Sequence, residues 1–143
     1  MTAAITFAVV LGAYLTGHTV ADYWVQSSAQ AMRKGLPGWA GRVACAKHVA
    51  TYTLTLAAFL ALTAWRLALP VSPAWAAAGL FVSAATHYFA DRRTPLRRVA
   101  DLTGKGEFWR SGEGLASGAA HLDQSWHWLW LFAAALITAG GAR

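Results

Sequence analysis

Residues 129–139, Leu-Trp-Leu-Phe-Ala-Ala-Ala-Leu-Ile-Thr-Ala, decide the fold class of this sequence because they carry no charge and offer no polar face. Residues 56–62, Leu-Ala-Ala-Phe-Leu-Ala-Leu, have the same character. A helix on the surface of a soluble bundle needs a polar outer face, whereas a membrane-spanning helix needs about 20 mainly apolar residues. Both stretches are therefore predicted to lie inside membrane-spanning helices.

Four apolar spans extend from these two stretches across the whole chain, at residues 3–26, 43–69, 73–91 and 119–140. The composition agrees, since 57% of the 143 residues are hydrophobic and 13% are charged, against about 25% charged residues in a typical soluble domain. An ordinary soluble enzyme is thereby disfavoured, although a small soluble α-bundle is the alternative. We expect an all-α, integral-membrane four-helix antiparallel bundle that forms one domain, 1–143.

Basic residues predict the orientation of the bundle. Ten of the twelve Lys and Arg residues lie in or beside two polar segments, 27–42 and 92–118. By the positive-inside rule both segments face the cytoplasm, which leaves both termini outside the cell. No Lys or Arg precedes Arg33, so the first span lacks the basic start of a signal peptide and is expected to be retained.

Polar residues inside the spans recur at helical spacing. His18 and Asp22, His87 and Asp91, and Asp123 and His127 are each four residues apart, which places each pair on one helix face. The predicted directions of the spans bring every pair, and His48 of the second span, to the same cytoplasmic level. Buried ionisable residues in a membrane are costly and tend to be functional.

Imidazole together with carboxylate suits zinc, iron or manganese, and zinc is the first choice here. Two alternatives stay open, namely a polar network that only holds the helices together and a proton or cation pathway. Cys45 lies three residues before His48 and is either a small buried side chain or a thiolate ligand. His121 is expected to point away from the cluster. The predicted metal ligands are His18, Asp22, His48, His87, Asp91, Asp123 and His127, with Asp22 and Asp91 as catalytic residues.

The basic segment 92–118 has two interpretations. Its arginines could anchor the chain at anionic lipid headgroups. Alternatively, Arg93 and Lys105 are substrate-binding residues that hold a phosphate-bearing molecule near the polar level. No nucleic-acid-binding module is recognisable, so membrane lipids are the expected partners and nucleic acid is not. The oligomeric state is left open.

Three short stretches resemble one protein family. Residues 17–26, Gly-His-Thr-Val-Ala-Asp-Tyr-Trp-Val-Gln, residues 87–91 and residues 123–127 are similar to signatures of the bacterial domain-of-unknown-function family 3307. His48 of the second span falls where the family carries another histidine, so the resemblance covers all four spans. Residues 94–98 and 102–105 also resemble small membrane proteins of actinobacteria and their mobile elements. The resemblance implies a multi-pass protein of the bacterial plasma membrane.

A looser similarity to membrane-bound metal-dependent hydrolases implies hydrolysis of a lipid or phosphate ester. The only glutamates are Glu107 and Glu113, outside the polar level, so an aspartate would have to act as the base. The alternatives are a non-enzymatic membrane accessory protein, for example of a mobile element, and a small proton or cation carrier.

Overall fold

The computed structural model describes residues 2–142, and over this range the chain is all-helical, without a strand. Four α-helices are long: α1 (Thr2–Val20), α3 (Gly38–Leu67), α4 (Pro73–Asp91) and α7 (Gly118–Ala139). The shorter elements are α2 (Ser28–Arg33), α5 (Thr94–Leu102), α6 (Gly106–Trp109), the π-helix η1 (Ala21–Val25) and the 3₁₀ helix η2 (Gly114–Ala116). The predicted all-α class is confirmed.

The predicted count of four helices is too low, because the two basic segments are not open loops. Segment 27–42 contains α2 and the start of α3, and segment 92–118 contains α5, α6 and η2. Local signals explain this. Ser27 and Gln30 form a reciprocal capping box that starts α2. Pro95 lies in the first turn of α5, where its missing N–H costs no helical hydrogen bond.

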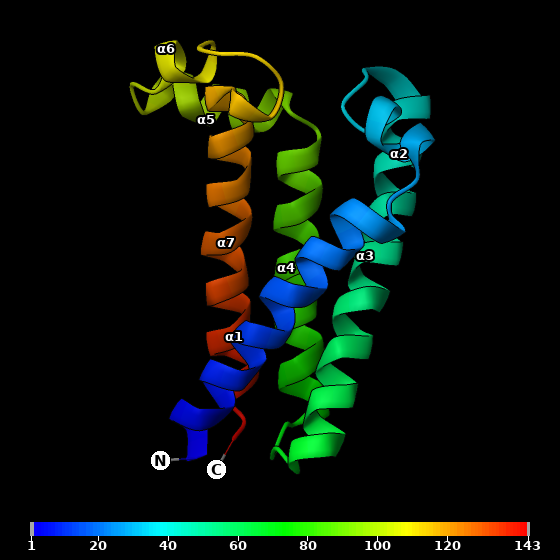
Figure 1. Ribbon diagram of the computed structural model, residues 1–143, viewed down its shortest axis with the longest axis vertical. Coiled ribbons are helices and arrows are strands. Elements are labelled where there is room, and N and C mark those ends of the chain that lie inside the picture. The colour runs from blue at the N-terminus through cyan, green and yellow to red at the C-terminus, as the bar shows by residue number, and fades with distance from the viewer. Residues whose placement is uncertain (1, 143) are drawn as a thin grey trace.

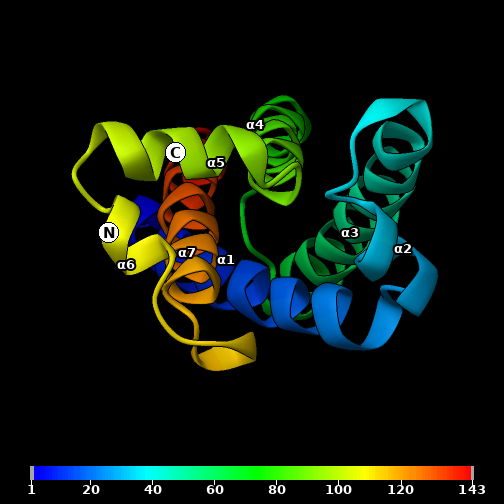
Figure 2. The ribbon, with the colours of Figure 1, turned by 90° about the horizontal axis from the view of Figure 1, so that it is seen from above.

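The four long helices run alternately up and down, so that neighbours in the chain are antiparallel (Figure 1). Helix α1 packs against α3 and α7, and α4 packs against the same two helices. The start of α1 and the end of α7 lie at one end of the bundle (Figure 1). The short helices α2, α5 and α6 lie at the opposite end, where α5 crosses the ends of α4 and α7 (Figure 2).

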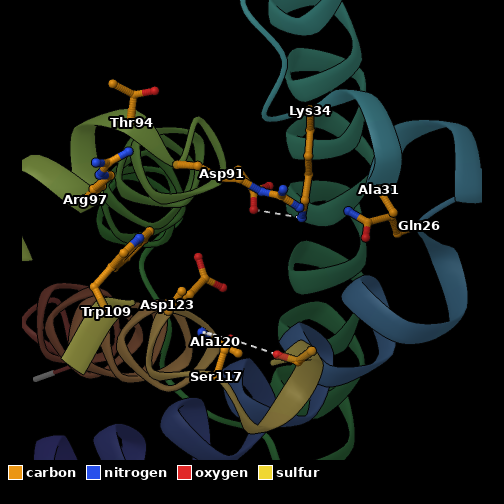
Figure 3. Close-up of a pocket in the computed structure, with 13 residues that line it drawn as sticks. Gln26, Ala31, Lys34, Asp91, Thr94, Arg97, Trp109, Ser117, Ala120 and Asp123 are labelled. Atoms are coloured by element: carbon orange, nitrogen blue, oxygen red, sulfur yellow. Dashed lines mark hydrogen bonds and ion pairs between the residues drawn. The ribbon is translucent and has the colours of Figure 1, made fainter. Parts of the chain in front are cut away.

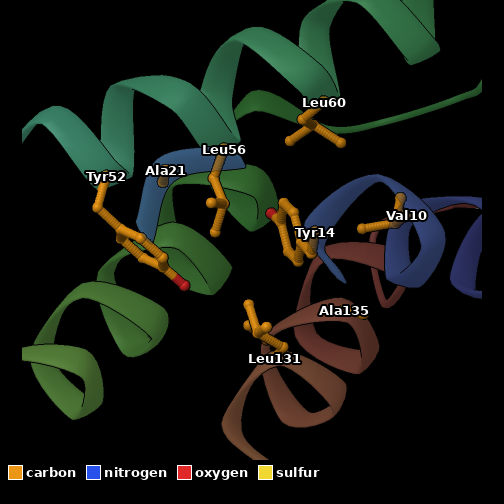
Figure 4. Close-up of a cluster of buried hydrophobic side chains, with 9 residues drawn as sticks. Val10, Tyr14, Ala21, Tyr52, Leu56, Leu60, Leu131 and Ala135 are labelled. Carbon is orange, nitrogen blue, oxygen red and sulfur yellow. The ribbon is translucent and has the colours of Figure 1, made fainter. Parts of the chain in front are cut away.

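An apolar core lies between α1, α3 and α7, mainly in the half of the bundle where α1 starts and α7 ends, and Figure 4 shows its side chains in close-up. It includes Val10, Leu56, Leu60 and Leu131, all at most 5% exposed. Gly79 lets α4 approach α7 closely, since a Cβ atom there would lie 2.7 Å from the carbonyl oxygen of Ala134. A side chain at this position would push the two helices apart.

Two helical segments, Thr2–Val25 and Gly38–Leu67, are long and apolar enough to cross a membrane. Helices α4 and α7 fall short of the same criterion within residues 2–142. The core helix of a soluble protein can also meet this criterion of length and apolar composition. Residues 2–142 therefore contain two helices of membrane-spanning length and composition.

Candidate metal centre

Seven ionisable side chains from all four long segments meet at the level of the bundle just beneath the short helices. The four histidines are each at most 3% exposed. The side chain of Asp91 is 3% exposed and that of Asp22 is 11%, whereas Asp123 at 31% is the most accessible member. The structure therefore brings together every residue that the sequence predicts as a metal ligand: His18, Asp22, His48, His87, Asp91, Asp123 and His127.

One group of three ligand atoms in this cluster comes from Asp22, His48 and His87. The Nε2 atoms of His48 and His87 are 3.0 Å apart. Asp22 Oδ1 lies 3.3 Å from the first of them and 3.7 Å from the second. A four-coordinate zinc ion with bonds of about 2.0–2.1 Å holds its ligand atoms roughly 3.3 Å apart. The three atoms thus have the separations of one face of such a coordination sphere.

Asp91 offers a second oxygen to the same pair of imidazoles. Its Oδ2 atom lies 3.3 Å from His48 Nε2 and 3.2 Å from His87 Nε2. The two aspartates therefore form two triangles that share the edge between His48 and His87. Either carboxylate can complete a three-atom ligand set with these two histidines.

A second group of ligand atoms surrounds His127 of α7. His127 Nε2 lies 3.5 Å from Asp123 Oδ2, and the His127 ring centroid is 4.2 Å from that of His87. Asp91, Asp123 and His127 offer ligand atoms within 4.8 Å of one another, as do His18, His87 and His127. Since the trio of Asp91, Asp123 and His127 shares no residue with the trio of Asp22, His48 and His87, the cluster has room for two ligand sets.

Several of these buried atoms make no hydrogen bond within residues 2–142 although other polar atoms lie close by. They include Asp22 Oδ1, Asp91 Oδ2 and His127 Nε2. A buried polar atom without a partner is destabilising, so natural proteins avoid it unless the atom serves another purpose. These atoms lie close together without forming hydrogen bonds to one another, which is the arrangement expected of atoms that bind a common ligand.

Local backbone geometry places Asp22. The helix widens into the π-turn η1 from Ala21 to Val25, and the Gln26 amide donates to the Ala21 carbonyl oxygen at 2.9 Å. Such π-turns are rare overall, and those that occur often lie at functional sites. Because the turn changes the spacing, Gln26 lines a cavity beside the cluster rather than extending the regular stripe of His18 and Asp22.

Sequence reasoning assigned Lys34 no role in the site, and it placed Arg92 among the arginines that either anchor the chain at lipid headgroups or help to hold a phosphate. The Lys34 ammonium is 2.7 Å from Asp91 Oδ1. The Arg92 guanidinium donates to the backbone carbonyl oxygens of Lys34 at 2.5 Å and Leu36 at 2.7 Å. Arg92 thereby ties the α2–α3 connection to the end of α4 and positions Lys34. Gln124 was also missed as a partner, and its Oε1 lies 3.3 Å from His18 Nε2.

The remaining residues singled out by the sequence lie outside the cluster. His121 is exposed, with its ring beside Phe108. Cys45 is buried, and its thiol lies 3.9 Å from the Tyr88 carbonyl oxygen, where it belongs to none of the ligand trios of residues 2–142. Arg93 lines the cavity beside Asp91 and Asp123, whereas Lys105 lines a separate, smaller groove with Trp126.

No family model, curated protein or solved structure matches the chain. The resemblance to family 3307 therefore stays a prediction.

Proposed function

We propose that this chain is a multi-pass membrane protein whose His/Asp cluster binds a divalent metal ion, with zinc as the first choice. The observation that carries this proposal is the triangle of Asp22 Oδ1, His48 Nε2 and His87 Nε2, with sides of 3.0–3.7 Å. Two imidazoles and a carboxylate make a mixed nitrogen and oxygen ligand set of the type that zinc accepts. The unpaired oxygens of Asp22 and Asp91 support it further.

The outer surface of the bundle supports a membrane location. Large apolar side chains are exposed on α3, α4 and α7, among them Leu54 (69%), Phe81 (73%) and Trp128 (60%). In water these large apolar side chains would be exposed to solvent, which monomeric soluble proteins limit. In a bilayer the same side chains would meet lipid tails.

The proposed orientation places the cluster at the cytoplasmic side of the bacterial plasma membrane, with both termini outside. The basic segments 27–42 and 92–118 flank the end of the bundle that carries the cluster, and α1 starts and α7 ends at the other end (Figure 1). Cysteine labelling in a Cys45→Ala background tests this. A cysteine at Leu67 should react in intact cells and one at Leu102 only after permeabilisation, and the reverse pattern would overturn the orientation.

Hydrolysis of an ester is the chemistry that the site can support. A divalent ion supplies Lewis acidity that lowers the pKa of a coordinated water. Asp91 lines both the cluster and the adjacent cavity, so its carboxylate can accept a proton from a water at the cavity wall. Asp22, at 11% exposure, is the second carboxylate that can take this role.

A non-enzymatic membrane protein is the second candidate, and the Lys34–Asp91 ion pair and the His18–Gln124 contact favour it. Both contacts join separate helices, so the cluster would then only stabilise the packing. Metal content separates the two proposals, because a purely structural network needs no ion.

The test is metal analysis of tag-free protein purified in detergent without chelator. We expect at least about one divalent ion per chain, and less than about 0.2 would overturn the metal proposal. His87→Ala should lose the ion. His121→Ala is the matched control, since it removes an exposed histidine of the same chain outside the cluster, and it should keep wild-type metal content.

A further inference from the structure

A cavity of about 690 Å³ lies beside the cluster, at the end of the bundle where the short helices pack (Figure 3). Its volume falls within the range of about 300–1,000 Å³ that is usual for small-molecule sites. Asp91 and Asp123 line it, and both belong to the ligand trio that includes His127. The cavity therefore gives access from outside the bundle to the more exposed of the two ligand sets.

Three basic side chains line the same cavity, namely Lys34 from the end of α2, Arg93 from the α4–α5 junction and Arg97 from α5. Figure 3 shows Lys34 and Arg97 on different sides of the space, with Asp123 on a third. Three cations outnumber the two carboxylates, so the cavity is positive. A divalent ion bound to Asp91 and Asp123 would make it more so, which favours an anionic ligand.

The position of Arg93 is built into the backbone. Its φ angle is 57°, in the left-handed region that side chains other than glycine rarely adopt. Such unfavourable conformations are kept where the surroundings over-determine them, often at ligand sites. Gly35 provides the space, since a Cβ atom there would lie 2.7 Å from Arg93 Cδ and 2.9 Å from Arg93 Nε. The Arg93 side chain therefore lies directly against the backbone of the α2–α3 connection.

Lys34 is held at the boundary between cavity and cluster. Arg92 binds the Lys34 carbonyl oxygen and fixes the backbone, while the Lys34 ammonium reaches Asp91 Oδ1. Arg97 is less constrained, because its Nε atom is 3.8 Å from the exposed Asp101 carboxylate. It can turn toward a ligand at little cost, since exposed ion pairs contribute little to stability.

We propose that this cavity binds a phosphate group of a phosphate ester, which Arg93, Arg97 and Lys34 contact beside the Asp91 and Asp123 carboxylates. Guanidinium groups match phosphate oxygens in charge and in planar geometry. The part of the binding that a metal ion would add rests on the proposed function. The basic side chains can bind phosphate with or without that ion. A lipid headgroup and a soluble phosphate ester present the same chemistry to the cavity.

Binding of phosphate to the full chain in detergent tests the proposal. Equilibrium dialysis with radiolabelled inorganic phosphate should show saturable binding, both in zinc-loaded and in chelator-treated protein, with higher affinity in the former. Arg93→Ala should weaken binding about tenfold, the loss expected for one charge-assisted contact. Arg98→Ala is the matched control, because Arg98 is an exposed arginine of α5 that does not line the cavity.

A second variant changes no charge. Gly35→Ala displaces the Arg93 side chain and should weaken phosphate binding while leaving zinc content unchanged. For the lipid source, native mass spectrometry of protein from nanodiscs should show retained phosphatidic acid in wild type and less of it in Arg93→Ala, with phosphatidylcholine as the reference lipid. Retention of this lipid or saturable binding of inorganic phosphate supports the site and identifies the source.

Equal binding by Arg93→Ala and Arg98→Ala, or no binding of either probe, would overturn the cavity proposal even if zinc is present. Absence of zinc with Arg93-dependent phosphate binding would overturn the metal proposal and leave the cavity proposal supported. The two proposals therefore fail separately.

Discussion

The buried polar groups in the two halves of the bundle differ in how they are hydrogen-bonded. In the half nearer the termini, the Tyr14 hydroxyl pairs with Thr138 Oγ1 at 3.0 Å, while Thr6 Oγ1 and Trp130 Nε1 are exceptions that have no partner within residues 2–142. In the other half, oxygens of Asp22 and Asp91 lie 3.2–3.7 Å from two imidazole nitrogens and yet form no hydrogen bond with them. The first arrangement stabilises helix packing through an isolated hydrogen bond between two helices. The second gathers ligand-type atoms around common points, which favours ion binding.

The largest expected effect is a gain in stability on zinc binding that depends on the half of the bundle that holds the His/Asp cluster. A ligand that binds only the folded state stabilises it by about 4 kcal/mol at a thousandfold excess over its Kd. Zinc added to chelator-treated protein should therefore raise the thermal unfolding midpoint of wild type markedly. A His48→Ala/His87→Ala double variant should show no such rise. An equal rise in both proteins would mean that zinc acts away from the cluster.

Removal of one carboxylate should have the next largest effect. Asp91→Asn keeps the shape of the side chain but removes a charge that faces both ligand sets. We expect zinc affinity to fall at least about 10–100-fold, the range known for groups that only support metal ligands. Asp101→Asn is the control, since Asp101 is 40% exposed and pairs with Arg110 on the surface. Isothermal titration with zinc gives both affinities, and equal values would remove Asp91 from the site.

Acidification should weaken zinc binding by a smaller factor. Each imidazole must be neutral to ligate a metal, so protons compete with zinc and affinity falls as the pH is lowered. Between pH 7.5 and about 4 we expect a loss of at least about tenfold, since protons compete with zinc for each ligating ring nitrogen. Competition with a zinc indicator at each pH measures it. A flat profile would indicate that carboxylates alone hold the ion.

Much of this arrangement follows from the spacing of residues in the sequence. Four-residue steps put His18 with Asp22, His87 with Asp91 and Asp123 with His127, and the alternating helix directions bring the three pairs to one level. These features depend only on helical periodicity and short connections, which a sequence displays directly.

Other features depend on contacts between distant residues, so periodicity could not reveal them. The π-turn at Asp22 adds a backbone irregularity with no distinct sequence signal. Lys34 reaches Asp91 only because Arg92 holds the backbone of a connection 58 residues away in the chain. The short helices α5 and α6 lie in segment 92–118, whose basic character had indicated a loop rather than helices.

The smallest expected effect concerns the apolar half. Tyr14→Phe removes the hydroxyl that pairs with Thr138 and should lower the free energy of unfolding by about 1 kcal/mol, the usual net contribution of one hydrogen bond. Zinc content should stay at the wild-type value. Denaturant unfolding in detergent and metal analysis measure the two quantities. A loss of zinc in this variant would show that the two halves are not independent.

X-ray absorption at the zinc edge of the zinc-loaded, tag-free protein tests the central claim most directly. If the cluster binds the ion, the spectrum should show nitrogen and oxygen ligands at about 2.0–2.1 Å, with the outer-shell scattering of imidazole rings and no sulfur shell at about 2.3 Å. The imidazole scattering should persist in His121→Ala and disappear in the His48→Ala/His87→Ala variant. A wild-type spectrum with only oxygen ligands, or with a sulfur ligand from Cys45, would contradict the account.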